Sequence, residues 1–270
     1  MTRRKEHIIL NGVSSPFRIL HISDVHFSLW TSHEQNQQLI SDILRKTDFY
    51  SVSCKFPKII AVTGDLVSRD LNSCSIPDAV NLLVRLKQIA PVVYSLGNHE
   101  KDLPAPILED MLKQCRKAGI LVLDNSSVVL YDMTFTGLTL PQEVYKNSNG
   151  NYFFLEKITP EMIASCVGIC SAVPCILLAH SPIGFDAYAK WGADLVLSGH
   201  VHGGIVRIPF VGGILSPERK FFPRYTKGIY YSGASVMNVS AGIGKFRVNN
   251  PSEFVCIDVI PKNFRNLKKN

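Results

Sequence analysis

Five short segments of this 270-residue chain carry side chains of the kinds that bind divalent metal ions. Carboxylate and amide oxygens suit hard cations, and imidazole nitrogens suit borderline ones. Each segment follows a short apolar run that predicts a buried strand. Such side chains at strand ends predict a two-metal site that hydrolyses a phosphate ester or pyrophosphate. The residues concerned are Asp24, His26, Asp65, Asn98, His99, Glu100, His180, His200 and His202.

The spacing within two segments allows paired ligands. Asp24 and His26 are two residues apart, as are His200 and His202. In a strand that continues into its loop, residues i and i+2 point the same way, so each pair is expected to face one site. Glycines before the ligands permit tight turns that bring the next residue close to an ion. These glycines are Gly64, Gly97 and Gly199.

The five segments differ in how much each indicates alone. A single His180 after a strand, or an isolated Asp-x-His, is usually a turn residue or a hydrogen-bonded polar group. Gly-Asn-His-Glu at 97–100 is more specific, and Gly-His-x-His-Gly-Gly at 199–204 more so. Because all five occur after apolar strands, the set favours a metal site. His21 is expected to be a core residue or a neighbour of the ligands.

Alternating elements are predicted to position the first three segments. Apolar periodicity predicts strands and helices in turn through residue 120, which indicates a largely parallel sheet with helical crossovers. The second half is richer in strands, so we expect two sheets packed face to face with helices outside. The expected strands cover 17–23, 58–63, 91–96, 127–137, 175–179, 193–198 and parts of 228–259, and the expected helices 36–49, 75–89 and 105–118.

Composition favours one globular domain over residues 1–270. Hydrophobic residues make up 46% of the chain and charged residues 19%, which is enough to fill a sizeable core. The net charge of +7 favours anionic partners. Long loops are expected over 145–151 and 208–227, and the loops within about 205–250 are expected to shape the substrate site.

These late loops mix basic and aromatic residues, which suits phosphate, a nucleotide base, an acyl chain or a membrane surface. Alternatively, each basic residue is a solvated surface charge and each aromatic residue packs in the core or anchors a loop. The residues are Arg207, Phe210, Arg219, Lys220, Phe221, Phe222, Arg224, Tyr225, Lys227, Tyr230, Tyr231, Lys245 and Arg247.

Cysteine usage and hydropathy predict a cytoplasmic protein. No apolar run is long enough to span a membrane, and no secretory signal follows the basic N-terminus. Basic clusters at both ends are expected either to contact the inner face of a membrane peripherally or to be solvated tails. They comprise Arg3, Arg4, Lys5, Arg265, Lys268 and Lys269. Seven cysteines are expected to be reduced and buried, namely Cys54, Cys74, Cys115, Cys166, Cys170, Cys175 and Cys256.

The order of the five motifs resembles the calcineurin-like metallophosphoesterases from about residue 17 to 204. The run from Gly199 to Gly204, with Gly242, Gly244 and Arg247, resembles the bacterial YkuE-type phosphodiesterases. UDP-2,3-diacylglucosamine pyrophosphatases of lipid A biosynthesis form related branches. The resemblance implies an α/β (α+β) fold, a four-layer α-β-β-α sandwich with a dinuclear metal site at the C-terminal ends of the strands.

The resemblance also implies roles for the site residues. The first metal is held by Asp24, His26 and His202, the second by Asn98, His180 and His200, and Asp65 bridges them. Asp65, Asn98 and His99 are the implied catalytic residues, with His99 beside the leaving group and Glu100 compatible with orienting it. A metal-bound hydroxide attacks phosphorus, and His99 donates a proton or stabilises charge, a contribution of ~10²–10⁴-fold. Manganese is the expected metal; iron, zinc and magnesium also suit these ligands.

The expected substrate is a phosphodiester or pyrophosphate, either a phosphorylated small molecule or a nucleotide- or lipid-linked one such as UDP-2,3-diacylglucosamine. Three alternatives stay open: a phosphoprotein phosphatase, a nuclease, and a non-catalytic metal-stabilised scaffold. A scaffold needs no proton donor, so the presence of His99 argues against that alternative. Nucleic acid is not the expected partner, because the basic residues are dispersed and no nucleic-acid-binding module is recognised. The sequence leaves the oligomeric state open.

Overall fold

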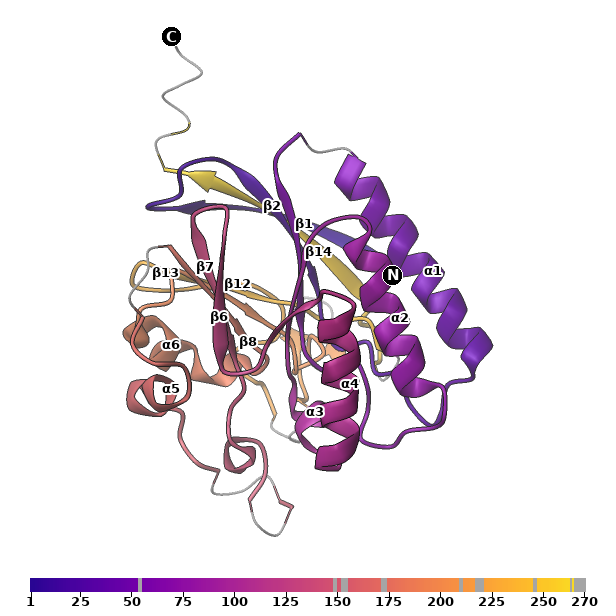
Figure 1. Ribbon diagram of the computed structural model, residues 1–270. Helices are drawn as coiled ribbons and strands as arrows, with labels where there is room; N and C mark the ends of the chain where they lie inside the picture. Colours follow the sequence, from indigo (N-terminus) through magenta and orange to yellow (C-terminus); the bar gives the residue numbers. More distant parts are fainter. Residues whose placement is uncertain are drawn as a thin grey trace.

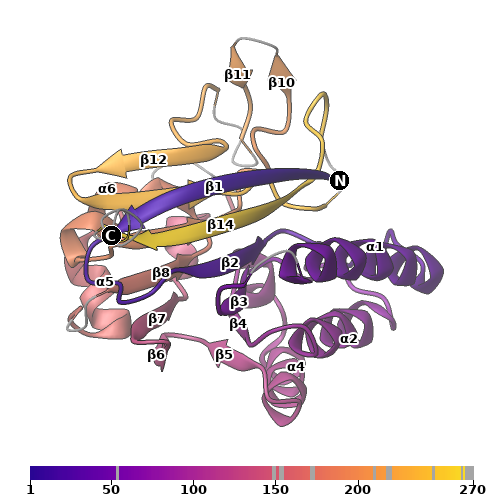
Figure 2. The same cartoon turned by 90° about the horizontal axis from the view of Figure 1, so that it is seen from above.

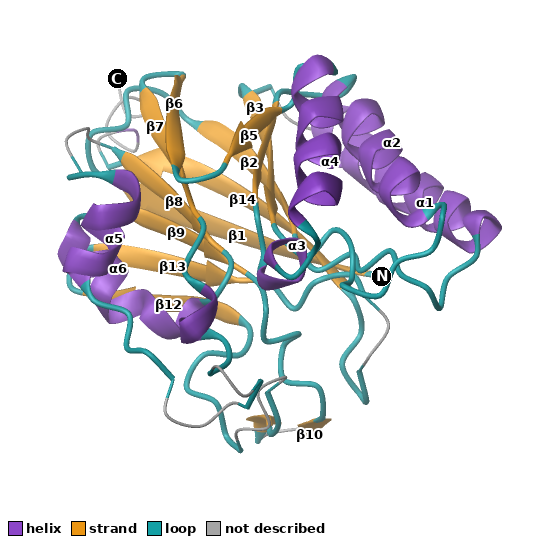
Figure 3. Ribbon diagram, turned by 60° about the horizontal axis from the view of Figure 1, so that its bottom comes forward, coloured by secondary structure: helices purple, strands orange, loops and turns teal. Residues whose placement is uncertain are grey.

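Two six-stranded β-sheets pack face to face, and helices cover the outer face of each sheet (Figure 1). The computed structural model describes residues 1–52, 55–147, 150–151, 155–170, 174–208, 211–216, 221–244, 247–262 and 264. Figure 3 shows the strands between two groups of helices. The predicted four-layer α-β-β-α sandwich is therefore confirmed.

The first sheet has the strand order β1-β14-β2-β3-β4-β5. Strands β2 to β5 run parallel, and β14 pairs antiparallel with β2 and parallel with β1. The strands are β1 (Thr2–Leu10), β14 (Glu253–Pro261), β2 (Phe17–Ile22), β3 (Lys58–Thr63), β4 (Val92–Ser95) and β5 (Leu121–Leu123). The helices on this side are α1 (His33–Val52), α2 (Ser75–Lys87) and α4 (Ala105–Lys117), and the short α3 (Asn98–Lys101) follows β4.

The second sheet has the strand order β12-β13-β9-β8-β7-β6. Its strands are β12 (Gly228–Ser232), β13 (Ser235–Val239), β9 (Leu195–Ser198), β8 (Cys175–Ala179), β7 (Met133–Leu138) and β6 (Ser126–Leu130). It is covered by α5 (Pro160–Val167) and α6 (Phe185–Trp191), and short 3₁₀ turns lie at Gln142–Val144 and Pro182–Gly184. A separate two-stranded ribbon, β10 (Arg207–Ile208) and β11 (Gly212–Gly213), projects beyond the sheets (Figure 2).

Alternation along the strands builds the layers. In β3, Ile59 and Ala61 enter the core between the sheets, where they belong to the same cluster as Leu178 of β8. Ile60 and Val62 of β3 instead pack with the helices of the first side. Since successive side chains of a strand face opposite sides, a strand buried on both faces is apolar throughout. That explains why periodicity indicated these strands well.

The N-terminal basic cluster belongs to a strand and is not a solvated tail, so that one of its two interpretations is wrong, while membrane contact stays a prediction. Arg4 lies in edge strand β1, where Nη1 contacts Glu6 at 2.5 Å and Nη2 contacts Glu253 at 3.3 Å. The Lys5 ammonium lies 3.5 Å from Asp258. These charges therefore support the pairing of β1 with β14. The C-terminal cluster, Arg265, Lys268 and Lys269, lies outside the described residues.

Sequence periodicity also missed α5 and α6, because helices of 8 and 7 residues present too few turns for a clear pattern. The described cysteines form no disulfide. Burial differs from expectation, since Cys115, Cys175 and Cys256 are buried whereas Cys74, Cys166 and Cys170 are half-buried; Cys54 lies outside the described residues. In the part of the chain that is described, no helix combines the length and hydropathy needed to cross a membrane.

Candidate metal centre

The loops after β2, β3, β4, β8 and β9 meet at one end of the two sheets. Parallel neighbours in a sheet end at the same edge, so β2, β3 and β4 deliver their loops together, and β8 and β9 deliver theirs from the facing sheet. The side chains of Asp24 and Asp65 lie at the centre, at most 2% exposed. All the predicted ligands follow these strand ends.

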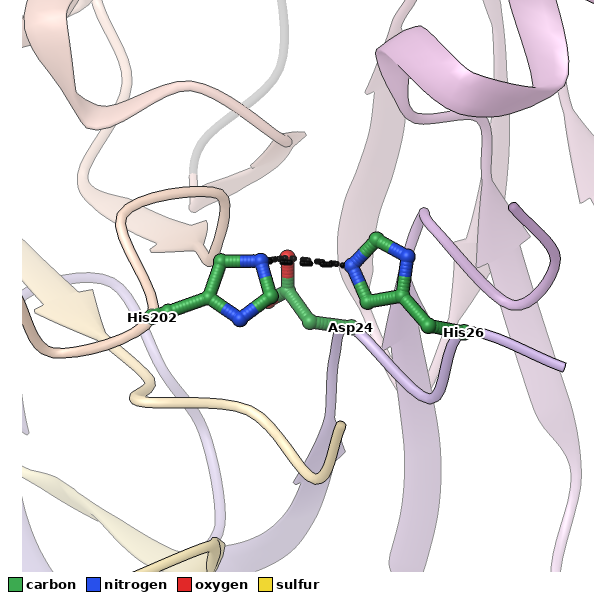
Figure 4. Close-up of side chains that lie close together, drawn as sticks. All are labelled: Asp24, His26 and His202. Atoms are coloured by element: carbon green, nitrogen blue, oxygen red, sulfur yellow. Dashed lines mark hydrogen bonds and ion pairs between the residues drawn. The ribbon is translucent and has the colours of Figure 1, made fainter. Parts of the chain in front are cut away.

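The first group of ligands is formed by Asp24, His26 and His202. Figure 4 shows the two imidazole rings facing each other from different loops, with the Asp24 carboxylate beside them. Their Nε2 atoms are 3.2 Å apart and lie 3.9 and 3.7 Å from Asp24 Oδ1. Three donor atoms this close can share one cation.

A second group is formed by Asp65, His180 and His200. His180 Nε2 lies 3.0 Å from Asp65 Oδ2 and 3.8 Å from Asp24 Oδ1, and the His180 and His200 ring centroids are 5.1 Å apart. Asp65 Oδ2 also lies 3.7 Å from His26 Nε2. It therefore faces both groups, as a bridging carboxylate must.

The ligands converge through left-handed backbone conformations, which corrects the expectation of an extended strand. The φ angles are 53° at Asp24, 58° at His26, 52° at Asp65, 68° at His200 and 50° at His202. Aspartate and histidine enter this region more readily than most residues, but it is sparsely populated. Backbone strain of this kind concentrates at functional sites.

Two glycines are required for close approach rather than for a turn. A Cβ on Gly199 would lie 1.8 Å from Ser23 Oγ and 2.3 Å from Asp24 Oδ2. A Cβ on Gly97 would lie 2.1 Å from Asp65 Oδ1. Both distances are far below van der Waals contact, so any side chain would displace a central carboxylate.

Glu100 holds the loop of Asp65 and does not orient His99, which corrects the expectation for this residue. Its buried carboxylate accepts hydrogen bonds from the N–H groups of Asp65 (2.8 Å), Leu66 (2.7 Å), Val67 (3.3 Å) and Gly97 (2.8 Å). Burial, and then the charge of Asp65, raise the pKa of Glu100, while the hydrogen bonds from the N–H groups of Gly97 and Asp65 oppose the rise. Glu100 thus ties two ligand loops together.

His99 lies at the rim of the site. Its Nδ1 accepts a hydrogen bond of 3.1 Å from the Arg69 N–H, and its Nε2 lies 4.0 Å from Asp65 Oδ2. Its side chain is 29% exposed, more than those of His26 and His202. Because Nδ1 accepts, the neutral ring carries its proton on Nε2, which faces the site.

Two of the ligand histidines make hydrogen-bond contacts that the sequence did not predict. His180 Nδ1 donates to the Thr63 carbonyl at 2.6 Å, and His26 Nδ1 lies 3.2 Å from Ser68 Oγ. Such contacts fix the ring and leave Nε2 to face a metal. A backbone carbonyl at a strand end is present in every sequence, so only the fold reveals which one is used.

His21 is a buried neighbour of the ligands, one of the two roles expected for it. Asn238 Nδ2 donates to its Nδ1, and its Nε2 lies against Thr63 Oγ1, both at 2.8 Å. Burial, followed by the charges of Arg4 and His180, lowers the pKa of His21 to about 3. The ring is therefore neutral at physiological pH.

The protonation preferences of the ligands divide into two kinds. Burial lowers the pKa of His26 and of His202 to about 3, with the charge of Asp65 opposing the fall in both and that of Arg247 adding to it at His202. Burial also acts on Asp65 and His180, but their mutual attraction outweighs it. The pKa of His180 rises to about 10, and the pKa of Asp65 falls well below its ordinary value. His180 must therefore lose a proton before it can bind a cation.

The donor atoms fit divalent cations. Asn98 Oδ1 is buried and lacks a hydrogen-bond partner among the described residues, a condition that normally costs free energy. The remaining donors are carboxylate oxygens and imidazole nitrogens, which suit manganese, iron and zinc. Asn98 begins α3, and the next N–H, that of His99, donates to Asp65 Oδ1 at 3.0 Å.

The late basic residues have different surroundings. Arg207 donates to the Gly203 carbonyl, Arg224 pairs with Asp186, and Lys227 pairs with Glu253. The three guanidinium nitrogens of Arg247 are buried without a partner among the described residues. Phe210, Arg219, Lys220 and Lys245 lie outside the described residues.

Comparison with known proteins places this site in context. The sequence profile described as calcineurin-like phosphoesterase matches residues 17–204, more than half of the chain. The chain is similar to phosphodiesterase YaeI of Escherichia coli (25% identical over 92% of this chain and 83% of the relative) and to the uncharacterized metallophosphoesterase YkuE of Bacillus subtilis (23% over 90% and 77%). It is 25% identical to the uncharacterized metallophosphoesterase Cj0846 of Campylobacter jejuni over 92% of this chain but 60% of that protein.

Proposed function

Because the chain belongs to the calcineurin-like phosphoesterase family, we propose that this phosphoesterase cleaves a phosphodiester or pyrophosphate bond with two divalent metal ions, manganese foremost. The observation that carries the proposal is the convergence of Asp24 and Asp65 with histidines from both sheets, with nitrogen–oxygen separations of 3.0 to 3.9 Å. Two such ions, when bound, lower the pKa of a water molecule and neutralise charge on phosphoryl oxygens. The preference for a diester is supported by the name of its relative YaeI, a phosphodiesterase.

The residues of the chain have distinct tasks in this proposal. Asp24, His26 and His202 hold one ion, Asn98, His180 and His200 hold the other, and Asp65 faces both. His99 presents its Nε2–H at the rim, because the Arg69 N–H occupies Nδ1. This Nε2–H can donate a hydrogen bond to the oxygen of the departing group and stabilise the negative charge that develops there, which is the second of the two roles expected for His99.

We also propose a lipid-linked substrate such as UDP-2,3-diacylglucosamine, taken at a membrane surface. Support comes from an apolar lobe on the segments around β10 and β11, consisting of Ile208, Val211, Phe221, Phe222 and Val248. These side chains are 45–73% exposed. The ribbon stands away from the sheets (Figure 2), and it begins shortly after the ligand His202. Exposed apolar side chains flanked by basic residues bind lipid interfaces.

The hydrolytic proposal is tested with metal-stripped protein, using bis-p-nitrophenyl phosphate and p-nitrophenyl phosphate as substrates. Manganese, zinc, magnesium or iron is added back, and Asn98→Ala and His99→Ala are compared with His7→Ala, a matched change of an exposed histidine on β1. We expect manganese-dependent diester cleavage that falls at least ~10²-fold in His99→Ala and is unchanged in His7→Ala. Turnover of the monoester alone, or no turnover with any metal, would contradict the proposed function.

The lipid proposal has its own test. Hydrolysis of UDP-2,3-diacylglucosamine in detergent micelles and sedimentation with anionic vesicles are measured for the wild type and for Phe221→Ser/Phe222→Ser. Tyr231→Ser is the control, because Tyr231 is equally exposed but lies on β12, outside the lobe. We expect only the double variant to lose vesicle binding. Equal binding by all three proteins, or no cleavage of the lipid, would refute this version.

A further inference from the structure

Arg247 has a buried guanidinium group that forms no hydrogen bond with the described residues. Its Nε, Nη1 and Nη2 atoms are all buried and without a hydrogen-bond partner there. A guanidinium offers five N–H donors and stays charged in proteins. Burying such a group without a partner costs several kcal/mol, by order of magnitude, so the arrangement calls for an anionic partner.

The nearby carboxylates are already engaged by other groups. Glu253 contacts Arg4 at 3.3 Å and Lys227 at 2.5 Å. Asp24 accepts from Ser23 Oγ at 2.5 Å and from the His200 N–H at 3.1 Å. Neither of these two carboxylates is hydrogen-bonded to Arg247, so within the described residues the guanidinium does not complete an internal ion pair.

Arg247 lines an open surface cavity of about 480 Å³ together with Ile243, Gly244, Asn249, Asn250, Pro251 and Ser252. A volume of this size accommodates part of a small ligand. Its walls contact the backbone of two residues of the metal centre. The Gly244 N–H donates to the Asp24 carbonyl at 2.6 Å, and Asn250 Nδ2 donates to the His202 carbonyl.

We propose that Arg247 binds the second, non-reacting phosphate of a pyrophosphate-linked substrate in this cavity. The inference rests on the proposed function, because the reacting phosphate is taken to lie at the metal centre. A guanidinium forms two parallel hydrogen bonds to phosphate oxygens, and charge-assisted bonds of this kind are the strong ones. The cavity adjoins the group of Asp24, His26 and His202. In this proposal, a second phosphate that is joined to the reacting phosphate by one bridging oxygen lies in the cavity and contacts Arg247.

The electrostatic setting agrees with this role. Burial lowers the pKa of Arg247, while the charges of Asp24 and Glu253 oppose that change. After burial, the charge of Arg247 is the largest influence that lowers the pKa of His202. The charge of Arg247 therefore acts on residues of the metal centre.

The test compares UMP and UDP as inhibitors of bis-p-nitrophenyl phosphate hydrolysis by the manganese-loaded protein. The variants are Arg247→Gln, Arg247→Lys and, as a control, Arg224→Gln, which removes an exposed guanidinium paired with Asp186. We expect UDP to bind the wild type at least ~10-fold more tightly than UMP, by the energy of charge-assisted hydrogen bonds. The preference should vanish in Arg247→Gln, recover partly in Arg247→Lys and persist in Arg224→Gln.

Two outcomes separate the possible failures. If UMP, UDP and the diester all weaken equally in Arg247→Gln, the residue acts only on the metal centre and the proposal is overturned. If the wild type hydrolyses no diester, the proposed function fails, and equilibrium dialysis of UDP and UMP against the metal-loaded proteins still tests Arg247. Equal binding of the two nucleotides by the wild type in dialysis would also overturn it.

Discussion

Replacing Glu100 by glutamine tests whether one buried carboxylate holds two ligand loops together. The change keeps the size of the side chain and turns one oxygen into an NH₂ group. In the wild type, Oε2 serves the N–H groups of Asp65 and Gly97, and Oε1 serves those of Leu66 and Val67. Whichever way the amide is placed, two N–H groups then face a donor.

The magnitude follows from those two lost acceptors. A buried donor left unsatisfied costs about 1–3 kcal/mol, which gives about 2–6 kcal/mol for the pair. Removing the repulsion between Glu100 and Asp65, one of the causes that raise the pKa of Glu100, offsets part of this. We expect Glu100→Gln to lower the free energy of unfolding by about 3 kcal/mol, a large share of the roughly 5–15 kcal/mol typical of a protein.

Urea unfolding of the metal-free proteins measures the loss, and manganese-dependent diester hydrolysis measures the effect on the site. Glu109→Gln on the exposed side of α4 is the matched control and should change the free energy of unfolding by less than about 0.5 kcal/mol. Since the loop of Asp65 is released, we expect the hydrolytic rate of Glu100→Gln to fall at least ~10²-fold.

A loss of less than 1 kcal/mol with wild-type hydrolysis would refute the reasoning. It would mean that the four N–H groups find other acceptors and that Glu100 does not position Asp65. A loss of stability with an unchanged hydrolytic rate would refute only the claim that Glu100 positions Asp65.

Three further outcomes are expected. Gly199→Ala places a methyl group against Ser23 and Asp24, so equilibrium dialysis should show fewer than two bound manganese ions per chain; retention of both would contradict the steric argument. The pKa of His21 is about 3 in the folded protein, against an ordinary value of 6.5. As the pH falls, the unfolded chain therefore binds a proton at this histidine before the folded protein does. The stability that the neutral ring contributes is present above pH 6.5 and is lost as the pH falls toward 3. In that window, the free energy of unfolding of the metal-free wild type should therefore fall relative to that of His21→Gln by up to about 1.4 kcal/mol per pH unit, as measured by urea unfolding. If the free energies of unfolding of the two proteins change with pH in parallel, His21 does not titrate this way. Manganese at about 100 times its dissociation constant should raise the free energy of unfolding of the wild type by about 2.7 kcal/mol, and that of Asp65→Asn by clearly less. An equal rise in Tm for the two proteins would argue against Asp65 as a ligand.

The layered fold and the position of the site were predictable from particular residues. Strand β3 is apolar throughout because one face packs on the second sheet and the other on helices. Apolar strands followed by Asp24, Asp65, Asn98, His180 and His200 place donors at strand ends, and the structure groups the Asp and His side chains among them; that they bind metal stays a prediction. The assignment of each ligand to a particular metal remains a prediction.

Edge strand β1 and the short helices were not predictable in the same way. Arg4 and Lys5 look like a basic tail until Glu253 and Asp258, some 250 residues later, provide their partners. Pairing partners so distant in sequence leave no local pattern, so charge alone did not reveal that the N-terminus forms a strand.

The sequence by itself determined which donor atoms are present, their order and the strands that deliver them, because side-chain chemistry and strand periodicity are local properties. Tertiary structure decided how they meet: left-handed backbone at Asp24 and His26, the four N–H groups around Glu100, and the isolation of Arg247 among the late basic residues. Each of these depends on backbone groups or charges from distant segments. A carboxylate has the same chemistry whether it binds a metal or a loop, and only the three-dimensional arrangement of its neighbours distinguishes the two.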